Sequence, residues 1–225
     1  MAIATSKPRM GTRGQPQLSR AAILKAAIDE FSREGVAGAR IDAIARAARV
    51  NKALLYYYYK DKDALYGAVL DHVFGGLTAV IHKALAQNLP PRQKFLAYLG
   101  AHFDYVASNP VYPRVVQGNL VWAGRGTVHQ YERVAKNYIR PIFLQVSALL
   151  REGIASGEFR AVNPLHFLPS VVAIIVTYFA SAPLMKMITG FDPLAPENIV
   201  QRRAAVLDLV STALFSRPQS AGENL

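Results

Sequence analysis

The stretch that decides the fold is IDAIARAARVNKALLYYYYKDKDAL, residues 41–65. Apolar residues recur at i, i+3, i+4 and i+7 in its first part, a spacing that predicts a short helix over residues 41–48. Asn51 is a residue type that caps helices, and it precedes a second short helix that we expect over residues 52–58. Asp61 then caps the start of a longer helix.

A further helix precedes this stretch. Ser19 can cap it, and Gly35 stands where it needs a left-handed residue at its C-terminus. Three helices with a tight turn between the second and third form a helix-turn-helix pattern, in which the third helix enters the major groove of DNA. The sequence therefore predicts a DNA-binding domain over residues 18–66, with Leu55 as the buried position of the third helix.

Helical spacing and turn residues continue beyond this domain, without strand alternation. We expect an all-α fold of about nine helices. The later ones are predicted over 111–122, over 128–156 with a kink at Pro141, after the cap at Asn163, and over 197–215. The second domain covers residues 67–216. A flexible basic arm, residues 1–17, and a frayed tail, residues 217–225, complete the chain.

The composition favours an anionic partner. The chain holds 26 Lys and Arg against 15 Asp and Glu, a formal net charge of +11. Residues 1–66 contain 12 of the basic and 6 of the acidic residues, so the positive charge is densest in the predicted DNA-binding domain. The absence of cysteine excludes a thiol nucleophile, a thiolate zinc site and a cysteine-ligated iron–sulfur cluster.

The sequence lacks the motifs of a catalytic or metal site. It has no HExxH pair and no G-x-S-x-G turn, so we predict no enzyme, no catalytic residues, no metal and no cofactor. The five histidines (72, 82, 102, 129 and 166) are interpreted as ordinary side chains with satisfied hydrogen bonds.

One apolar run, VVAIIVTYFA at residues 171–180, invites comparison with a membrane span. A spanning helix needs about 20 mostly apolar residues, and Pro169 and Pro183 interrupt this run on either side. We therefore interpret it as a helix buried in a core or a dimer interface, with no membrane partner. Residues 1–17 contain no apolar segment of a secretory signal, so we expect a cytoplasmic protein.

The N-terminal third of the chain resembles the TetR family of transcriptional regulators. The matching stretches are AILKAA (22–27) with Phe31 and Gly35, IARAA (44–48), Leu55-Tyr56 and YKDKDAL (59–65); a less diagnostic match is REGIASGEF (151–159). The chain departs from the family at the turn, where Arg49 replaces the usual glycine, so either Arg49 accepts a less common backbone conformation or the turn differs slightly. It also departs at Ala39-Arg40, where the family often has threonine.

The resemblance and the geometry of the motif together assign DNA-binding roles. Lys52, Ala53 and Leu54 lie in the first turn of the third helix, which faces base edges in such motifs. Other side chains are expected near the DNA backbone, and Tyr57 is left open between a DNA contact and packing; Tyr59 is expected to be buried. The full predicted set is Arg40, Asn51, Lys52, Ala53, Leu54, Tyr56, Tyr57, Tyr58 and Lys62.

The resemblance also implies that the rest of the chain binds a small-molecule effector and dimerises. We expect the apolar helix over residues 165–180 and the helix over 197–215 to build the homodimer. Aromatic and apolar residues that could line a ligand pocket are Phe103, Trp122, Tyr138, Phe143, Tyr178, Phe179 and Met185.

The function predicted from these features is a ligand-responsive repressor. It would bind a palindromic double-stranded DNA operator as a homodimer and be released by a small, largely apolar or aromatic inducer. A non-specific or architectural DNA-binding protein is the alternative, and an all-helical enzyme is a more remote one.

Overall fold

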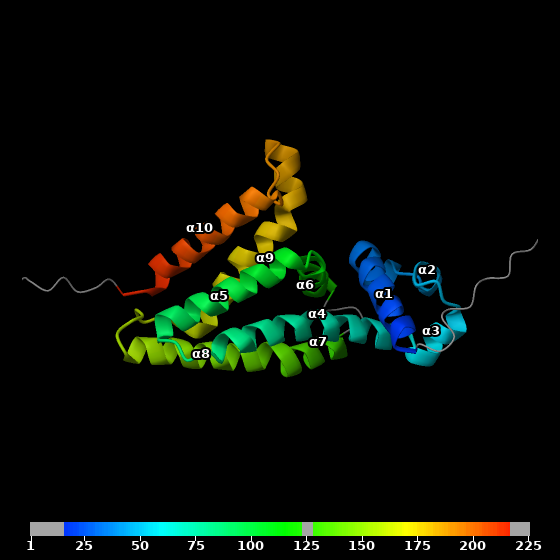
Figure 1. Ribbon diagram of the computed structural model, residues 1–225, viewed down its shortest axis with the longest axis horizontal. Coiled ribbons are helices and arrows are strands. Elements are labelled where there is room, and N and C mark those ends of the chain that lie inside the picture. Colours follow the sequence, from blue (N-terminus) through cyan, green and yellow to red (C-terminus); the bar gives the residue numbers. More distant parts are fainter. Residues whose placement is uncertain (1–15, 123–127, 217–225) are drawn as a thin grey trace, which may run out of the picture. The chain divides into compact units, whose positions relative to one another are not determined.

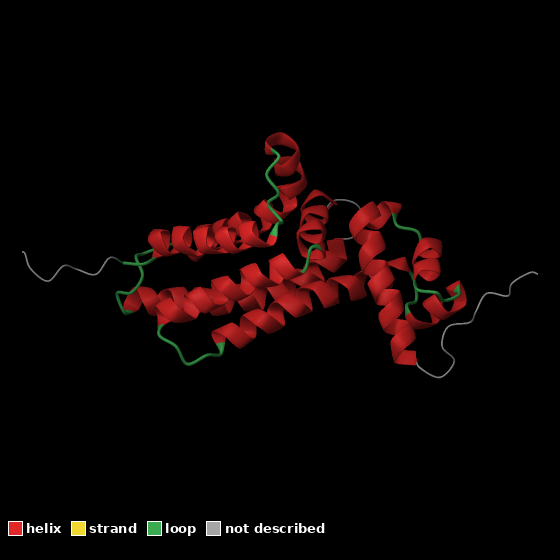
Figure 2. Ribbon diagram, turned by 45° about the horizontal axis from the view of Figure 1, so that its top comes forward, coloured by secondary structure: helices red, strands yellow, loops and turns green. Residues whose placement is uncertain are grey.

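The computed structural model describes residues 16–122 and 128–216, without the side chains of residues 117–122. Within these ranges the chain forms ten α-helices and a π-helical turn, and no strand (Figure 1, Figure 2). Because α7, the π-helical turn and α8 are continuous, this part of the chain has nine helical runs, which confirms the predicted all-α fold. The predicted tail, and the arm up to residue 15, lie outside the described residues.

The chain divides into two compact units, Met1–Val73 and Phe74–Leu225. The first unit contains three helices and the beginning of a fourth: α1 (Pro16–Gly38), α2 (Ile41–Ala47), α3 (Lys52–Tyr58) and α4 (Lys62–Leu85). Its helices pack around Ile23, Ile44 and Leu55, whose side chains are fully buried. The bounds of α2 and α3 agree with the predicted ranges 41–48 and 52–58 to within one residue.

Gly35 interrupts α1 where the sequence predicts its end. This residue has φ 67°, a backbone conformation that glycine adopts without steric cost, and the chain resumes a short helical turn up to Gly38. The predicted cap at Ser19 is wrong, because α1 begins three residues earlier at Pro16 and Ser19 is buried within it. The two later cap positions agree with expectation. The side-chain oxygen of Asn51 accepts a hydrogen bond from the Leu54 amide at 2.7 Å, and that of Asp61 accepts one from the Ala64 amide at 2.7 Å.

The second unit contains the rest of α4 and the remaining helices. α5 lies at its centre, since it packs against α8, α9 and α10 (Figure 1). Phe95, Leu99 and Phe103 of α5 are almost completely buried there. The bounds are α5 Pro91–Ser108, α6 Val111–Trp122, α7 Val128–Val134, η1 Ala135–Ile139, α8 Arg140–Ala155, α9 Pro164–Thr189 and α10 Pro196–Leu214.

The predicted kink at Pro141 takes the form of a π-helical turn directly before it. Pro141 has no amide hydrogen to donate, and the amide of Arg140 donates to the Ala135 carbonyl five residues earlier. The helical run therefore continues through the proline with a local change of hydrogen-bonding register.

α9 corrects the prediction that prolines confine the apolar run to a short helix. It is continuous over 26 residues, through both Pro169 and Pro183, although an interior proline removes one backbone hydrogen bond and crowds the carbonyl four residues earlier. Both α4 and α9 are long and apolar enough to cross a membrane by length and composition, with mean hydropathies of 1.5 and 1.9 in their most apolar windows. In α9 only 22% of that window is buried in the single chain.

Candidate DNA-binding surface and ligand cavity

The turn between α2 and α3 is held by backbone geometry. Arg49 has φ 56°, the left-handed conformation expected where the family usually has glycine. The amide of Val50 donates to the Ala45 carbonyl at 3.0 Å, so the chain folds back over the end of α2. With Asn51 capping α3, this short turn fixes the direction in which α3 leaves α2.

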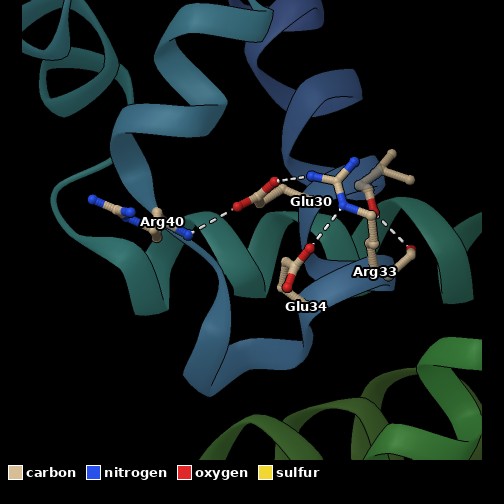
Figure 3. A network of polar contacts seen from close by, with 6 residues as sticks. Glu30, Arg33, Glu34 and Arg40 are labelled. Carbon is tan, nitrogen blue, oxygen red and sulfur yellow. Dashed lines mark hydrogen bonds and ion pairs between the residues drawn. The ribbon is translucent and has the colours of Figure 1, made fainter.

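A buried carboxylate supports the other end of α2. Glu30 is only 6% exposed and accepts a hydrogen bond from the backbone amide of Arg40 at 3.1 Å. Arg33 donates to the same carboxylate at 2.5 Å, and also to Glu34 at 2.8 Å (Figure 3). Glu30 was not predicted from the sequence, although a charged residue within the buried face of α1 was a usable signal.

Arg40 precedes α2 as its N-cap residue. Its side chain makes no capping hydrogen bond, and the residue is exposed. The amide of Arg40 is fixed by Glu30 as described above, so the backbone that carries this side chain is firmly positioned. Its predicted contact with a DNA phosphate stays a prediction.

α3 is anchored by one side chain and exposes most others. Leu55 is fully buried, whereas Tyr56 is 47% and Tyr57 80% exposed. Because Tyr57 has so little contact with the rest of the unit, packing does not account for its position. Lys52 and Ala53 are also exposed, Leu54 and Tyr58 are half-buried, and Tyr59 is buried as predicted.

Two of the predicted lysines have partners within the first unit. The ammonium of Lys52 lies 2.6 Å from the carboxylate of Asp42, and this hydrogen bond lowers the pKa of Asp42. Both side chains are about half exposed, so the pair is accessible to exchange with another partner. The ammonium of Lys62, at the start of α4, donates to the Ala37 carbonyl at 3.2 Å.

Further exposed basic residues belong to the same unit. Arg46 lies in the last turn of α2, Arg49 forms the turn, and Lys60 follows α3. All three are exposed, and the site prediction omitted them. Their charge was the available signal, because Lys and Arg near a recognition helix commonly contact phosphates.

The second unit contains a cavity of about 520 Å³, within the usual range for small-molecule sites, and it opens to solvent where Ile139, Ala173 and Thr177 are exposed. Six elements contribute to it: α4, α5, α6, the π-helical turn, α8 and α9. The lining residues are Leu77, Ile81, Tyr98, His102, Tyr112, Val116, Ile139, Ile142, Phe143, Val146, Leu168, Pro169, Val172, Ala173, Val176, Thr177 and Ala180.

Only part of the predicted pocket set meets this cavity. Phe143 lines it, and the side chain of Trp122 lies outside what the structure describes. Phe103 is buried against Phe179, with 5.4 Å between ring centroids, and neither lines the cavity.

The remaining predicted pocket residues have other surroundings. The ring of Tyr138 stacks on Phe74. Tyr178 donates to the Pro193 carbonyl at 3.0 Å and lies beneath the guanidinium of Arg202. Met185 is half-buried near the C-terminal end of α9. The cavity is instead formed largely by neighbouring residues of the same helices, such as Tyr98, Val176 and Thr177.

His102 contradicts the interpretation of the histidines as satisfied. Its side chain lines the cavity, is 2% exposed, and neither ring nitrogen has a hydrogen-bond partner among the described residues. Burial lowers the pKa of His102 to about 4, because the charged imidazolium would lose its hydration. Across the described ranges, no three His, Asp or Glu side chains form a group that could hold a metal ion.

Two family models match the chain. Residues 23–69 match "Bacterial regulatory proteins, tetR family", and residues 91–210 match "Tetracyclin repressor-like, C-terminal domain". The first match covers α2 and α3 completely, and the second covers most of the helices that form the cavity.

Curated relatives are transcriptional regulators. The HTH-type transcriptional repressor SCO4008 of Streptomyces coelicolor is 32% identical over 178 residues, which cover 77% of this chain and 84% of the relative. The HTH-type transcriptional regulator RutR of Escherichia coli K12 is 28% identical over 75% of this chain and 77% of its own length.

Solved structures share the fold. The transcriptional regulator SCO4942 from Streptomyces coelicolor has a TM-score of 0.65 and 27% identity, covering 89% of this chain and 99% of its own. HlyIIR, a hemolysin II transcriptional regulator, has a TM-score of 0.67 over 90% of this chain and 99% of its own, at 22% identity.

Proposed function

This chain belongs to the TetR family of bacterial transcriptional regulators, and on that premise we propose that it is a ligand-responsive repressor. In this proposal a homodimer binds a palindromic DNA operator in the cytoplasm. A small, largely apolar or aromatic molecule then occupies the cavity of the second unit and releases the DNA.

The observation that carries the proposal is the surface of α3. Leu55 fixes the helix to the core, while Lys52, Ala53 and Tyr57 remain exposed. Lysine can donate to guanine O6 and N7, and an alanine methyl can contact the methyl group of thymine. To contact a base, the Lys52 ammonium exchanges the Asp42 carboxylate for an acceptor on DNA.

Contacts with the phosphate backbone complete the proposed surface. Arg40, Tyr56, Tyr58 and Lys62 are assigned to it, and Asn51 supports it by capping α3. These contacts would attract every DNA sequence, whereas the first turn of α3 would discriminate between sequences.

The apolar surface of α9 and α10 supports dimerisation. Met187 and Ile188 are 81% and 73% exposed, and Val200 of α10 is 68% exposed. A helix that is apolar all round needs a cover, and a second copy of the same two helices provides one in a symmetric four-helix interface. Two copies of α3 would then face successive major grooves, about 34–36 Å apart.

α4 is the proposed connection between ligand and DNA. It begins in the first unit and contributes Leu77 and Ile81 to the cavity in the second. A ligand that prefers one of two positions of this helix would favour a dimer whose α3 helices no longer match the half-sites. The resulting loss of operator affinity cannot exceed the difference in ligand affinity between the two states.

Footprinting of the purified protein on the DNA upstream of its own gene tests the proposal. At roughly physiological salt, a dimeric repressor protects one palindromic segment, because specific contacts outlast phosphate attraction. The variant Val200→Asp, which places a charge at an exposed apolar position of α10, is expected to lose the dimer and the footprint. Smeared protection that disappears with added salt would instead favour an architectural protein.

A further inference from the structure

The wall of the cavity carries no formal charge. Four lining residues have hydrogen-bonding side chains (Tyr98, His102, Tyr112 and Thr177), the others are hydrocarbon, and none is Asp, Glu, Lys or Arg. A charged ligand would lose part of its hydration here without gaining a counter-charge from the lining. The cavity therefore favours neutral molecules.

Three of the polar side chains gather at one wall. The His102 ring contacts two tyrosines, with centroid separations of 6.1 Å to Tyr98 and 6.4 Å to Tyr112. These side chains come from α5 and α6, while α8 and α9 contribute only hydrocarbon apart from Thr177. The cavity thus has a polar wall and a larger apolar part.

His102 provides an unfulfilled hydrogen-bonding position at that wall. Both of its ring nitrogens are buried, and neither has a partner in the described part of the chain. Buried polar groups are nearly always hydrogen-bonded, so a ligand oxygen at this position would satisfy an otherwise costly group. No hydrophobic residue at position 102 would offer this contact.

The protonation states of His102, Tyr98 and Tyr112 determine which kind of ligand oxygen can bind at this wall. Burial lowers the pKa of His102 to about 4 and raises the pKa of the Tyr98 and Tyr112 hydroxyls, so all three groups are neutral near pH 7. A neutral imidazole can accept from a hydroxyl or donate to a carbonyl, but supplies no positive charge for a carboxylate.

We propose that the cavity binds a neutral, mostly hydrocarbon molecule whose single hydrogen-bonding oxygen contacts His102. The oxygen lies at the α5–α6 wall, and the hydrocarbon part lies against α8 and α9. This inference names the chemical class of the effector in the proposed function. Only the regulatory role of the ligand rests on that proposed function, whereas its binding to the cavity does not.

Three probes of one shape test this inference: biphenyl, 4-phenylphenol and biphenyl-4-carboxylate. Calorimetric titration of the full-length protein at pH 7 compares their affinities. We expect 4-phenylphenol to bind about tenfold more tightly than biphenyl, which corresponds to one net hydrogen bond. The carboxylate is expected to bind at least tenfold more weakly than the phenol, because the cavity would desolvate its charge.

His102→Phe separates the hydrogen bond from the shape of the cavity. It removes both ring nitrogens and keeps an aromatic ring, so it should abolish the preference for the phenol over biphenyl while retaining biphenyl binding. His82→Phe is the matched control. His82 also has a buried ring nitrogen without a partner among the described residues, but it borders a separate depression beside Lys94 and Glu152. This variant should keep the preference.

The inference is overturned if the carboxylate binds as tightly as the phenol, if no probe binds, or if His102→Phe retains the preference. The comparison of probes on the unaltered protein needs no variant, so a folding failure of His102→Phe would not remove the test. All titrations are performed without DNA. Failure of the footprint would therefore reject the repressor function separately, and failure of the probes would leave the footprint valid.

Discussion

The candidate sites of the two units differ in how many elements form them. In the first, the side chains expected to read DNA project from α3, a helix of seven residues with a single buried anchor, Leu55. In the second, the cavity is assembled from six elements that range from Leu77 to Ala180 along the chain. A surface on one short helix depends on local capping and turn geometry, whereas a cavity depends on the packing of distant segments.

This difference means that substitutions should have separable effects. Changes on the exposed face of α3 remove little buried area, so they should alter DNA affinity without much loss of stability. Changes at the cavity affect buried groups, so they should alter stability and ligand binding together. The following predictions test this separation, beginning with the largest expected effect.

Acid should destabilise the protein through His102. Its pKa is about 4 when folded and about 6.5 when exposed, so between these values the unfolded state binds more protons. Stability therefore falls as the pH drops from 6.5 to 4, by up to roughly 3 kcal/mol. Tyr98 and Tyr112, which face the ring, stay uncharged over this range. Urea unfolding at pH 7 and 4.5 measures the change, and His102→Phe should remove this contribution.

Lys52→Ala should weaken discrimination at one base pair by about 1–3 kcal/mol if this lysine reads a guanine. Lys62→Ala should weaken binding to all sequences equally. It should also lower the slope of log affinity against log salt concentration by about one. Fluorescence anisotropy with a set of single-base operator variants distinguishes the two. Equal effects of both substitutions on every DNA would contradict the assigned roles.

Asp42→Asn, which releases Lys52 from its ion pair, should strengthen DNA binding in the same anisotropy measurement.

Asn51→Ala should destabilise the first unit by about 1 kcal/mol, because the Leu54 amide loses its capping partner. Asn51→Asp is the matched control, since its carboxylate can still accept that hydrogen bond. Thermal unfolding should therefore separate the alanine variant from the other two proteins. The capping account fails if both substitutions reduce stability by the same amount.

Two adjacent glycines of α4 give the smallest and most discriminating prediction. A Cβ at Gly76 would lie 2.6 Å from the Tyr105 hydroxyl oxygen, whereas one at Gly75 would lie 3.7 Å from the Tyr138 ring. Gly75→Ala should stabilise the helix by about 0.5–1 kcal/mol. Gly76→Ala should cancel that gain or reverse it, because the Tyr105 ring must move. Denaturant unfolding of the two variants measures the difference, and equal stabilisation would exclude close packing at Gly76.

The sequence predicted the helix-turn-helix well because its signals are local. Asn51, Asp61 and Gly35 fix helix ends through interactions within a few residues, and each takes the expected role. Leu55 and Tyr59 were also predicted as buried from spacing and resemblance. Glu30 was missed because its partner, the Arg40 amide, lies ten residues away and becomes visible only in the folded unit.

The cavity could not be predicted in the same way. Aromatic residues on the apolar faces of helices either line a cavity or fill the core, and helical spacing does not distinguish these cases. Phe103 fills the core against Phe179, while Phe143 lines the cavity. His102 gave no signal in the sequence, since its importance comes from burial without a partner among the described residues.

Selection of binding sites from random double-stranded DNA, at physiological salt, tests the central claim most directly. Two symmetric copies of α3 should enrich a palindrome whose half-site centres lie about 10–10.5 base pairs apart, or a multiple of that spacing. Enrichment should be lost with Lys52→Ala at the position that this lysine reads. Binding without an enriched sequence, or enrichment of a single unrepeated half-site, would contradict the proposed dimeric repressor.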